Sequence, residues 1–152
     1  MAMTSYLDFA ENDYKYFMTS YEHGIVANAM AADAQEICEK YMKHVIDKYF
    51  EPETEEEQTE YDIHMRTHNL NKLMRFLDQR MGLKFDREVK AEMQIINGYY
   101  FTARYPGDES IEVTKEDLDV CADAVEHCRE SILKMIQEIE NELNENEKAE
   151  FP

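Results

Sequence analysis

The sequence predicts an all-α fold, on three observations. Residues that force a chain to turn are rare, with 4 Gly and 3 Pro among 152 residues. Long stretches are rich in Leu, Met, Ala, Glu and Lys, which lose little side-chain freedom in a helix, and β-branched runs are absent. Apolar residues recur at three- and four-residue spacing. A chain of this length holds one core, so we expect an up-and-down bundle of about five helices over residues 1–145.

Two long helices are expected in the first third of the chain. Ser5 and Asp8 are spaced as a capping box at the start of the first helix, and Gly24 is expected to end it. The second helix is predicted from about Ile25 to Tyr49. Its apolar stripe indicates that it lies across the middle of the core.

A charge-dense segment follows the second helix. Residues 51–62 hold seven acids and no base, beginning around Pro52. Such a stretch repels itself and has little apolar surface to bury, so we expect a mobile acidic loop over Glu53–Glu60.

Three further helices are predicted in the remainder. Their apolar residues run from Leu70 to Leu77, ended by Gly82, from Phe85 to Tyr100, and from Leu118 to Ile139. A turn is expected at residues 105–108, and Thr114 with Asp117 forms a second capping box before the last helix. From about Asn141 we expect that helix to fray, leaving an acidic tail at residues 146–152.

The charge balance bears on the kinds of partner. With 16 bases against 34 acids the net charge is −18, which repels a phosphate backbone and argues against nonspecific nucleic-acid binding. Residues 51–62 and 138–152 carry −7 and −5 of this, so the rest of the chain carries only −6. A local basic groove is therefore still compatible with the sequence. Its candidate residues, set against the lone Asp78, are Arg66, Lys72, Arg75 and Arg80.

The sequence also bears on location and redox state. No run of about 18 apolar residues occurs, and the first nine residues lack the basic and apolar regions of a secretory signal, so we expect a cytoplasmic protein with no membrane contact. Cys38, Cys121 and Cys128 are odd in number and form no CxxC pair. Buried free thiols are therefore expected rather than disulfides.

Three motifs occur in a helical context. Residues 34–43 read AQEICEKYMK, His68-Asn69-Leu70 opens the predicted third helix, and Tyr100 is followed by Arg104-Tyr105-Pro106. Taken in this order, and over about residues 14–135, the pattern resembles the HEPN domain, a name that stands for higher eukaryote and prokaryote nucleotide-binding. The resemblance implies an antiparallel bundle that usually forms a homodimer.

The resemblance also implies two functional branches. Some members accompany small nucleotidyltransferases, and others are ribonuclease toxins that use an Arg and a His about four to six residues apart. No arginine of this chain has a His at that distance downstream. We therefore expect no catalytic residues, and a non-catalytic module that dimerises and engages a protein partner, with a nucleotidyltransferase and a nucleotide as candidates. The alternative is a ribonuclease toxin with a non-standard site at His68 and Arg104.

The candidate ligand-binding residues are Gln35, Glu39 and Lys43, on one ridge of the second helix, with His68 and Arg104. Lys and Arg in such a groove contact phosphate, Arg in bidentate fashion. A structural role is the competing interpretation for Arg104 and His68: Arg104 would bridge to an acid of the second helix, and His68 would bond backbone or a carboxylate.

Two further patterns involve charged residues at helical spacing. Glu36 and Lys40 have the spacing of a surface ion pair. Glu60, His64 and His68 have the spacing that puts three metal ligands on one face of a continuous helix. Because that segment follows the acidic stretch and no further ligand is forced nearby, we expect no metal. Glycine-rich phosphate loops are absent, and no cofactor is expected.

Overall fold

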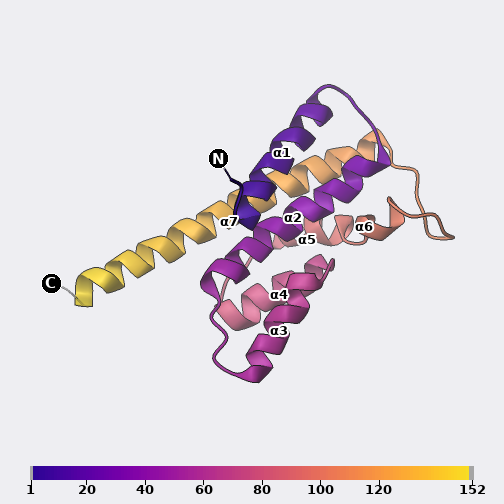
Figure 1. Ribbon diagram of the computed structural model, residues 1–152. Coiled ribbons are helices and arrows are strands. Elements are labelled where there is room, and N and C mark those ends of the chain that lie inside the picture. The colour runs from indigo at the N-terminus through magenta and orange to yellow at the C-terminus, as the bar shows by residue number, and fades with distance from the viewer. Residues whose placement is uncertain (1, 151–152) are drawn as a thin grey trace.

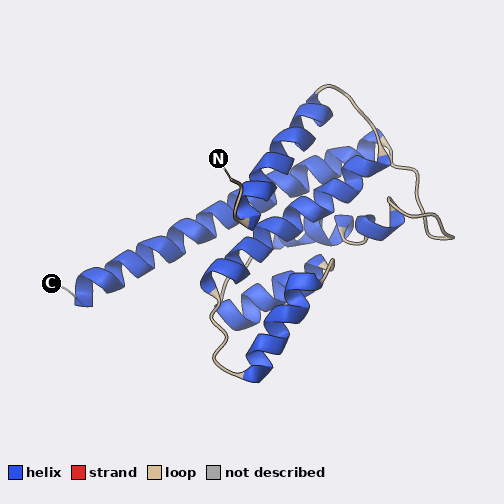
Figure 2. Cartoon of the chain, viewed as in Figure 1, coloured by secondary structure: helices blue, strands red, loops and turns tan. Residues whose placement is uncertain are grey.

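A computed structural model describes residues 2–150, which form seven α-helices and no strand (Figure 2). The predicted all-α bundle is confirmed. The helices are α1 Tyr6–Glu22, α2 Asn28–Tyr49, α3 Glu55–Arg66, α4 Leu70–Met81, α5 Arg87–Ile96, α6 Tyr99–Thr102 and α7 Lys115–Glu150.

Helix α2 is the central element of the bundle. It packs against α1 and α7 and also contacts α3, α4, α5 and α6, as its position in Figure 1 illustrates. Of its 22 residues, 14 are buried. A helix buried around most of its circumference lies inside the core rather than on its surface. This confirms the expectation that the second helix crosses the middle of the core.

The predicted helix ends are largely confirmed. The Asp8 amide donates to Ser5 Oγ at 3.1 Å, and the capping box is complete. At the start of α7 the Asp117 amide donates to Thr114 Oγ1 at 3.2 Å, and the Thr114 amide donates to Asp117 Oδ2 at 2.9 Å. Gly82 follows α4 with φ of +67°, in the left-handed region that only glycine enters without strain.

The acidic segment is not the loop that we predicted over Glu53–Glu60. It folds into α3, because its charges are placed where a helix favours them. Thr54 caps the helix by accepting from the Glu57 amide at 3.1 Å. Three glutamates occupy the first turn, where the partial positive charge of the helix N-terminus stabilises carboxylates. Tyr61 and Met65 pack against the core and attach the helix to the body.

The fourth predicted helix is interrupted. Helix α5 ends at Ile96, and Gly98, with φ of +107°, turns the chain before the short α6. The prediction of one helix from Phe85 to Tyr100 was wrong because apolar spacing continues across this Asn97-Gly98 turn. The break redirects the residues that follow it toward α2.

Helix α7 continues as a regular helix to Glu150, so the predicted fraying from Asn141 was wrong over the described part of the tail. Residues 151–152, the end of that predicted tail, lie outside the described residues. Glu and Lys have high helix propensity, which keeps the segment helical without packing. Every residue from 141 to 150 is exposed, and Figure 1 shows this end of α7 projecting past the bundle.

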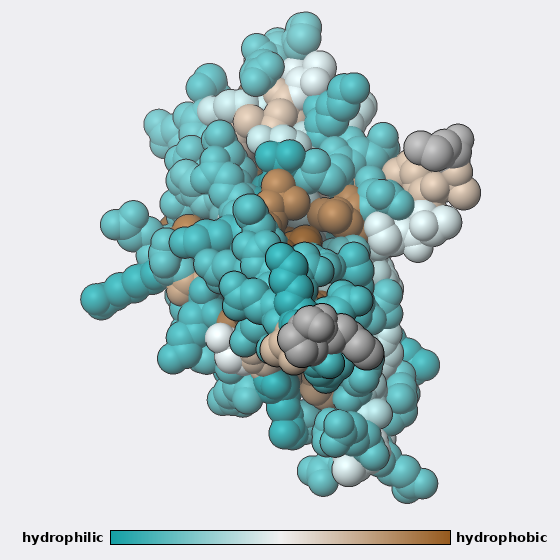
Figure 3. All heavy atoms as spheres, turned by 90° about the vertical axis from the view of Figure 1, so that its left-hand side faces the viewer, coloured by the Kyte–Doolittle hydropathy of each residue, from teal (hydrophilic) through white to brown (hydrophobic). Residues whose placement is uncertain are grey.

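The cysteines lie in the interior, and most of the surface in Figure 3 is hydrophilic. Cys38, Cys121 and Cys128 are buried free thiols, as expected. Hydrophilic residues cover most of the face in Figure 3, with a small group of hydrophobic ones exposed near its middle. None of the helices described between residues 2 and 150 is long and apolar enough to cross a membrane.

Candidate functional site

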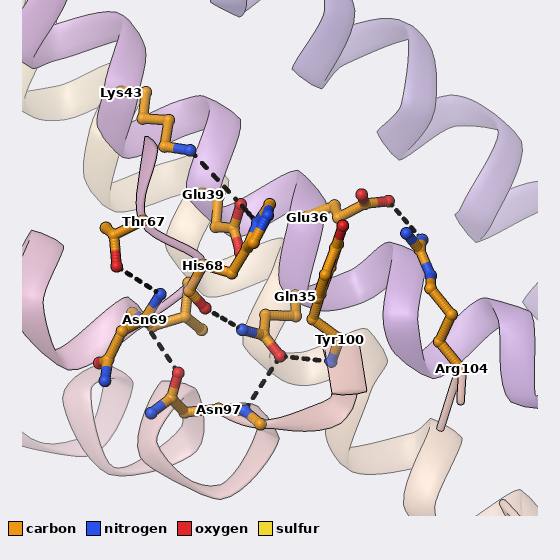
Figure 4. A network of polar contacts seen from close by, with 12 residues as sticks. Gln35, Glu36, Glu39, Lys43, Thr67, His68, Asn69, Asn97, Tyr100 and Arg104 are labelled. Atoms are coloured by element: carbon orange, nitrogen blue, oxygen red, sulfur yellow. Dashed lines mark hydrogen bonds and ion pairs between the residues drawn. The ribbon is translucent and has the colours of Figure 1, made fainter. Parts of the chain in front are cut away.

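The site lies where the middle of α2 meets two connecting segments. One segment, residues 67–69, joins α3 to α4, and the other, residues 97–98, joins α5 to α6. Polar side chains of α2 point toward both segments (Figure 4). Because α2 is inside the bundle, the polar groups at this junction are buried and must find partners within the chain.

Gln35 is fully buried and uses both ends of its carboxamide. Its Oε1 accepts hydrogen bonds from the amides of Gly98 at 3.0 Å and Tyr100 at 2.7 Å. Its Nε2 donates to the carbonyl oxygen of His68. One side chain therefore ties both connecting segments to α2. The hydrogen bonds from the Gly98 and Tyr100 amides also satisfy backbone groups that the break after α5 leaves without helical partners.

Glu39 lies one turn further along α2 and binds two cationic or basic groups. His68 Nδ1 is 3.1 Å from Glu39 Oε2, and Lys43 Nζ is 3.6 Å from the same oxygen. Glu39 Oε1 is buried and has no hydrogen-bond partner in the structure. Burial raises the pKa of the Glu39 carboxyl above its ordinary value, and the contacts with His68 and Lys43 oppose that effect only in part.

The ring of Tyr100 separates His68 from Arg104. The His68 imidazole stacks on the ring with centroids 3.8 Å apart, and the Arg104 guanidinium carbon lies 4.5 Å from the ring centroid. Figure 4 shows Tyr100 between these two side chains. Arg104 Nη2 in turn donates to Glu36 Oε2 at 3.0 Å. The imidazole and the guanidinium therefore face opposite sides of one aromatic ring and do not converge on a common space.

The structure brings four of the five predicted ligand-binding residues into one network. Gln35, Glu39, Lys43 and His68 are joined by the contacts above, whereas Arg104 binds to Glu36 beyond the Tyr100 ring. The first three are buried and do not face an open groove in this chain. Arg104 makes the bridge to an acid of α2 that its structural interpretation required. The imidazole of His68 binds a carboxylate, and the contact with Gln35 is made by the backbone carbonyl of His68 rather than by its ring. Their role in ligand binding stays a prediction.

The ion pair that the spacing of Glu36 and Lys40 allows is not formed. Lys40 binds instead to Asp13 of α1, while Glu36 binds to Arg104. The reason is that each side chain has an oppositely charged partner on a neighbouring element. The pairs therefore join elements to each other rather than stabilising α2 alone.

The metal-ligand spacing of Glu60, His64 and His68 does not become a site. Helix α3 ends at Arg66, so His68 leaves the face that the other two residues share. Glu60 binds to Arg80, and His64 Nδ1 contacts the Glu60 carbonyl oxygen. Within residues 2–150, no group of three or more His, Cys, Asp or Glu residues is placed to hold a metal ion.

Sequence reasoning missed the residues that shape this site from the α5–α6 side. Asn97 Oδ1 accepts from the Leu70 amide at 2.9 Å and so anchors the start of α4. The Asn97-Gly98 dipeptide is a turn signal that would have found the break. Tyr100 belonged to the motif, but no spacing rule indicated that its ring would lie between His68 and Arg104.

An aromatic face, defined here by Tyr100, Phe101 and Tyr105, lies next to this network. Phe101 is 57% exposed and Tyr105 is 51% exposed. The three rings contact one another, with centroids 5.0 to 6.3 Å apart. A hollow of about 280 Å³ borders Phe101 and His68. Gln35, Glu39 and Lys43 are turned inward, so the site presents the aromatic rings to solvent together with parts of His68 and Arg104.

The fold and this site together define a helical-bundle domain in which a buried polar network supports an exposed aromatic face. Comparison with known families places it further: the HEPN domain family matches residues 3–139, so the chain belongs to the HEPN domain family. Searches among curated proteins and among solved structures gave no significant match. The resemblance that the three motifs indicated is confirmed.

Replacing Gln35 tests whether its carboxamide holds the site together. Gln35→Leu leaves two buried amides and one carbonyl without partners, so we expect the free energy of unfolding to fall by about 3 kcal/mol. Gln35→Glu keeps the acceptor but buries a carboxylate against the His68 carbonyl oxygen, so at neutral pH it should lose at least as much. Chemical denaturation measures both values. Equal stability of Gln35→Leu and the unchanged protein would contradict the role given to this side chain.

Glu39 should make stability depend on pH. Because its folded pKa lies above the ordinary 4.5, the folded state holds the proton more tightly than the unfolded state does. Its contribution to the free energy of unfolding therefore decreases as pH rises from 4.5 through the raised pKa. Glu39→Gln lacks this loss, so its stability relative to the unchanged protein should increase across that window. Denaturation at a series of pH values measures the difference.

A matched control is Glu142→Gln, on the exposed end of α7. This variant should follow the pH profile of the unchanged protein. If the stability of Glu39→Gln also runs parallel to that of the unchanged protein at all pH values, burial does not raise the pKa of Glu39.

Proposed function

We propose that this HEPN domain is a non-catalytic interaction module that forms a homodimer and binds a protein partner through its aromatic face. The observation that carries the proposal is the contrast at the site. Its polar side chains are occupied by one another, whereas Phe101 and Tyr105 remain more than half exposed. Aromatic side chains are enriched at protein interfaces because they bury a large area with few rotatable bonds.

Further exposed aromatic residues on α1 support dimerisation through the same side of the molecule. Phe9 is 46% exposed and Tyr16 is 68% exposed, and they flank Asp13 on that helix. Asp13 binds to Lys40 of α2, one turn from the Glu36 that binds to Arg104. These pairs connect the α1 aromatics to the aromatic face across α2. A surface of this composition favours a self-complementary contact between two copies.

The resemblance supplies the candidate partners. A nucleotidyltransferase is the protein partner that it suggests, and a nucleotide is the candidate small ligand. The aromatic rings beside Arg104 suit either one, since flat rings pack on protein side chains and stack on nucleobases.

A ribonuclease is the second candidate function, and one observation favours it. Glu39 holds Nδ1 of His68, which leaves Nε2 of an oriented imidazole beside a ring that also contacts Arg104. The position of the Tyr100 ring argues against a ribonuclease, because the ring lies between His68 and Arg104. General acid–base catalysis by one side chain and phosphate binding by the other require both to reach the same phosphate. The arrangement therefore supports binding more than catalysis.

The dimer is tested with the double variant Phe101→Ser/Tyr105→Ser. Light scattering should give a dimeric mass for the unchanged protein at micromolar concentration and a monomeric mass for the variant, because the variant loses its apolar contact area. Leu143→Ser is the control, since Leu143 is also 51% exposed but lies on the projecting end of α7. A monomeric unchanged protein, or an unaffected double variant, would contradict the proposal.

Catalysis is tested directly by incubating the purified protein with total RNA. We expect no cleavage, since the Arg-His spacing is absent and the net charge of −18 repels RNA. Cleavage that disappears in both His68→Ala and Arg104→Ala would establish the ribonuclease and overturn the non-catalytic assignment.

A further inference from the structure

The basic residues of α4 do gather on one side of the bundle, as the sequence allowed. Two hollows flank this helix, one between α3 and α4 and one on the α5 side, and Arg75 and Gln79 line both. Neither hollow shares a residue with the aromatic face. On so acidic a chain, an excess of positive charge in a hollow would attract anions.

The hollow between α3 and α4 has one of its three cations held by a close ion pair from within. Its volume is about 440 Å³, and it holds Lys72, Arg75 and Arg80. Arg80 is already occupied, because its Nε donates to Glu60 Oε2 at 2.8 Å and its second nitrogen binds the other carboxylate oxygen. A carboxylate already inside the hollow competes with any incoming anion.

The hollow between α4 and α5 has the same balance of charge, but its one ion pair is longer. Its volume is about 430 Å³, within the range of small-molecule sites. Arg75, Lys84 and Lys90 line it together with one acid, Asp78. Lys84 lies 3.8 Å from Asp78, while Arg75 and Lys90 have no carboxylate within 4.0 Å among the described residues. The hollow therefore carries an excess of two positive charges.

One side chain of the same hollow has an unsatisfied polar atom. Asn71 lines this hollow, and its Oδ1 is buried behind the wall and accepts no hydrogen bond in the structure. The carboxamides of Gln79 and Gln94 add further donors and acceptors to its wall. A buried acceptor without a donor costs free energy, and a ligand that brings a hydroxyl group recovers that cost. The wall thus offers cations for an anion, and a rotation of the Asn71 carboxamide would turn an acceptor toward a hydroxyl.

We propose that the α4–α5 hollow binds a small phosphate-bearing molecule with at least two negative charges and a hydroxyl group. Two uncompensated cations match a dianion, and the planar fork of Arg75 suits bidentate contact with phosphate oxygens. A monocarboxylate would neutralise only one of them. Polymeric nucleic acid does not suit the hollow, because the many acids elsewhere on the chain repel its remaining phosphates.

Calorimetry with pyrophosphate as the probe, at constant ionic strength, tests the anion site. The unchanged protein should bind it, and Arg75→Gln/Lys90→Gln should bind it roughly tenfold more weakly or not at all, because the variant lacks both uncompensated cations. The control is Lys15→Gln/Lys134→Gln, which removes the same charge from exposed positions outside the hollow. Circular dichroism verifies that each variant keeps its helices.

Three outcomes would overturn the proposal: no binding by the unchanged protein, an equal loss in the control variant, or tighter binding of citrate than of pyrophosphate. The hydroxyl assignment has its own test with glycerol phosphate. Asn71→Ala should weaken glycerol phosphate more than inorganic phosphate, whereas an equal change would remove Asn71 from the site. Amide chemical-shift changes confined to α4 and α5 would support the location, and changes centred on the aromatic face would contradict it.

Discussion

The carboxamide of Gln35 is the interaction on which the geometry of the site depends. It receives two backbone amides from one segment and binds a backbone carbonyl of another, so it holds together two segments that lie 33 to 65 residues beyond it in sequence. Once these segments are fixed, His68 and Tyr100 are placed to stack. Arg104 then reaches Glu36 across the other side of the ring. The aromatic face is therefore positioned by a side chain that never reaches the surface.

The cost of this arrangement is the burial of polar side chains in the middle of the most enclosed helix. Glu39 and Lys43 are nearly inaccessible, and one oxygen of Glu39 has no partner. An apolar pair of similar size would often be as stable or more so, since buried ion pairs seldom repay their full desolvation. Such an apolar pair would not fix the orientation of the side chains around it. Hydrogen bonds define where His68 lies, whereas apolar contacts tolerate many orientations.

The sequence was sufficient for the fold class and for most helix ends, because these follow from local spacing and from capping residues such as Ser5 and Thr114. It failed at α3, where the repulsion among glutamates was weighed without the stabilisation that Thr54 and the helix N-terminus supply. The motif residues were found, but their contacts were not. Gln35 binds backbone groups, which every residue possesses, so nothing in the sequence singles out its partners. The Tyr100 stack depends on a turn at Gly98 that apolar spacing does not detect.

The projecting end of α7 affects how the size of the molecule is measured. At a rise of about 1.5 Å per residue, the exposed residues 141–150 extend the helix by about 15 Å. A particle with such an extension experiences more friction in solution than a sphere of equal mass. It therefore diffuses slowly and leaves a gel-filtration column early, as a larger protein would. Subunit number must accordingly be taken from a measurement of mass, because hydrodynamic radius alone would make one copy resemble two.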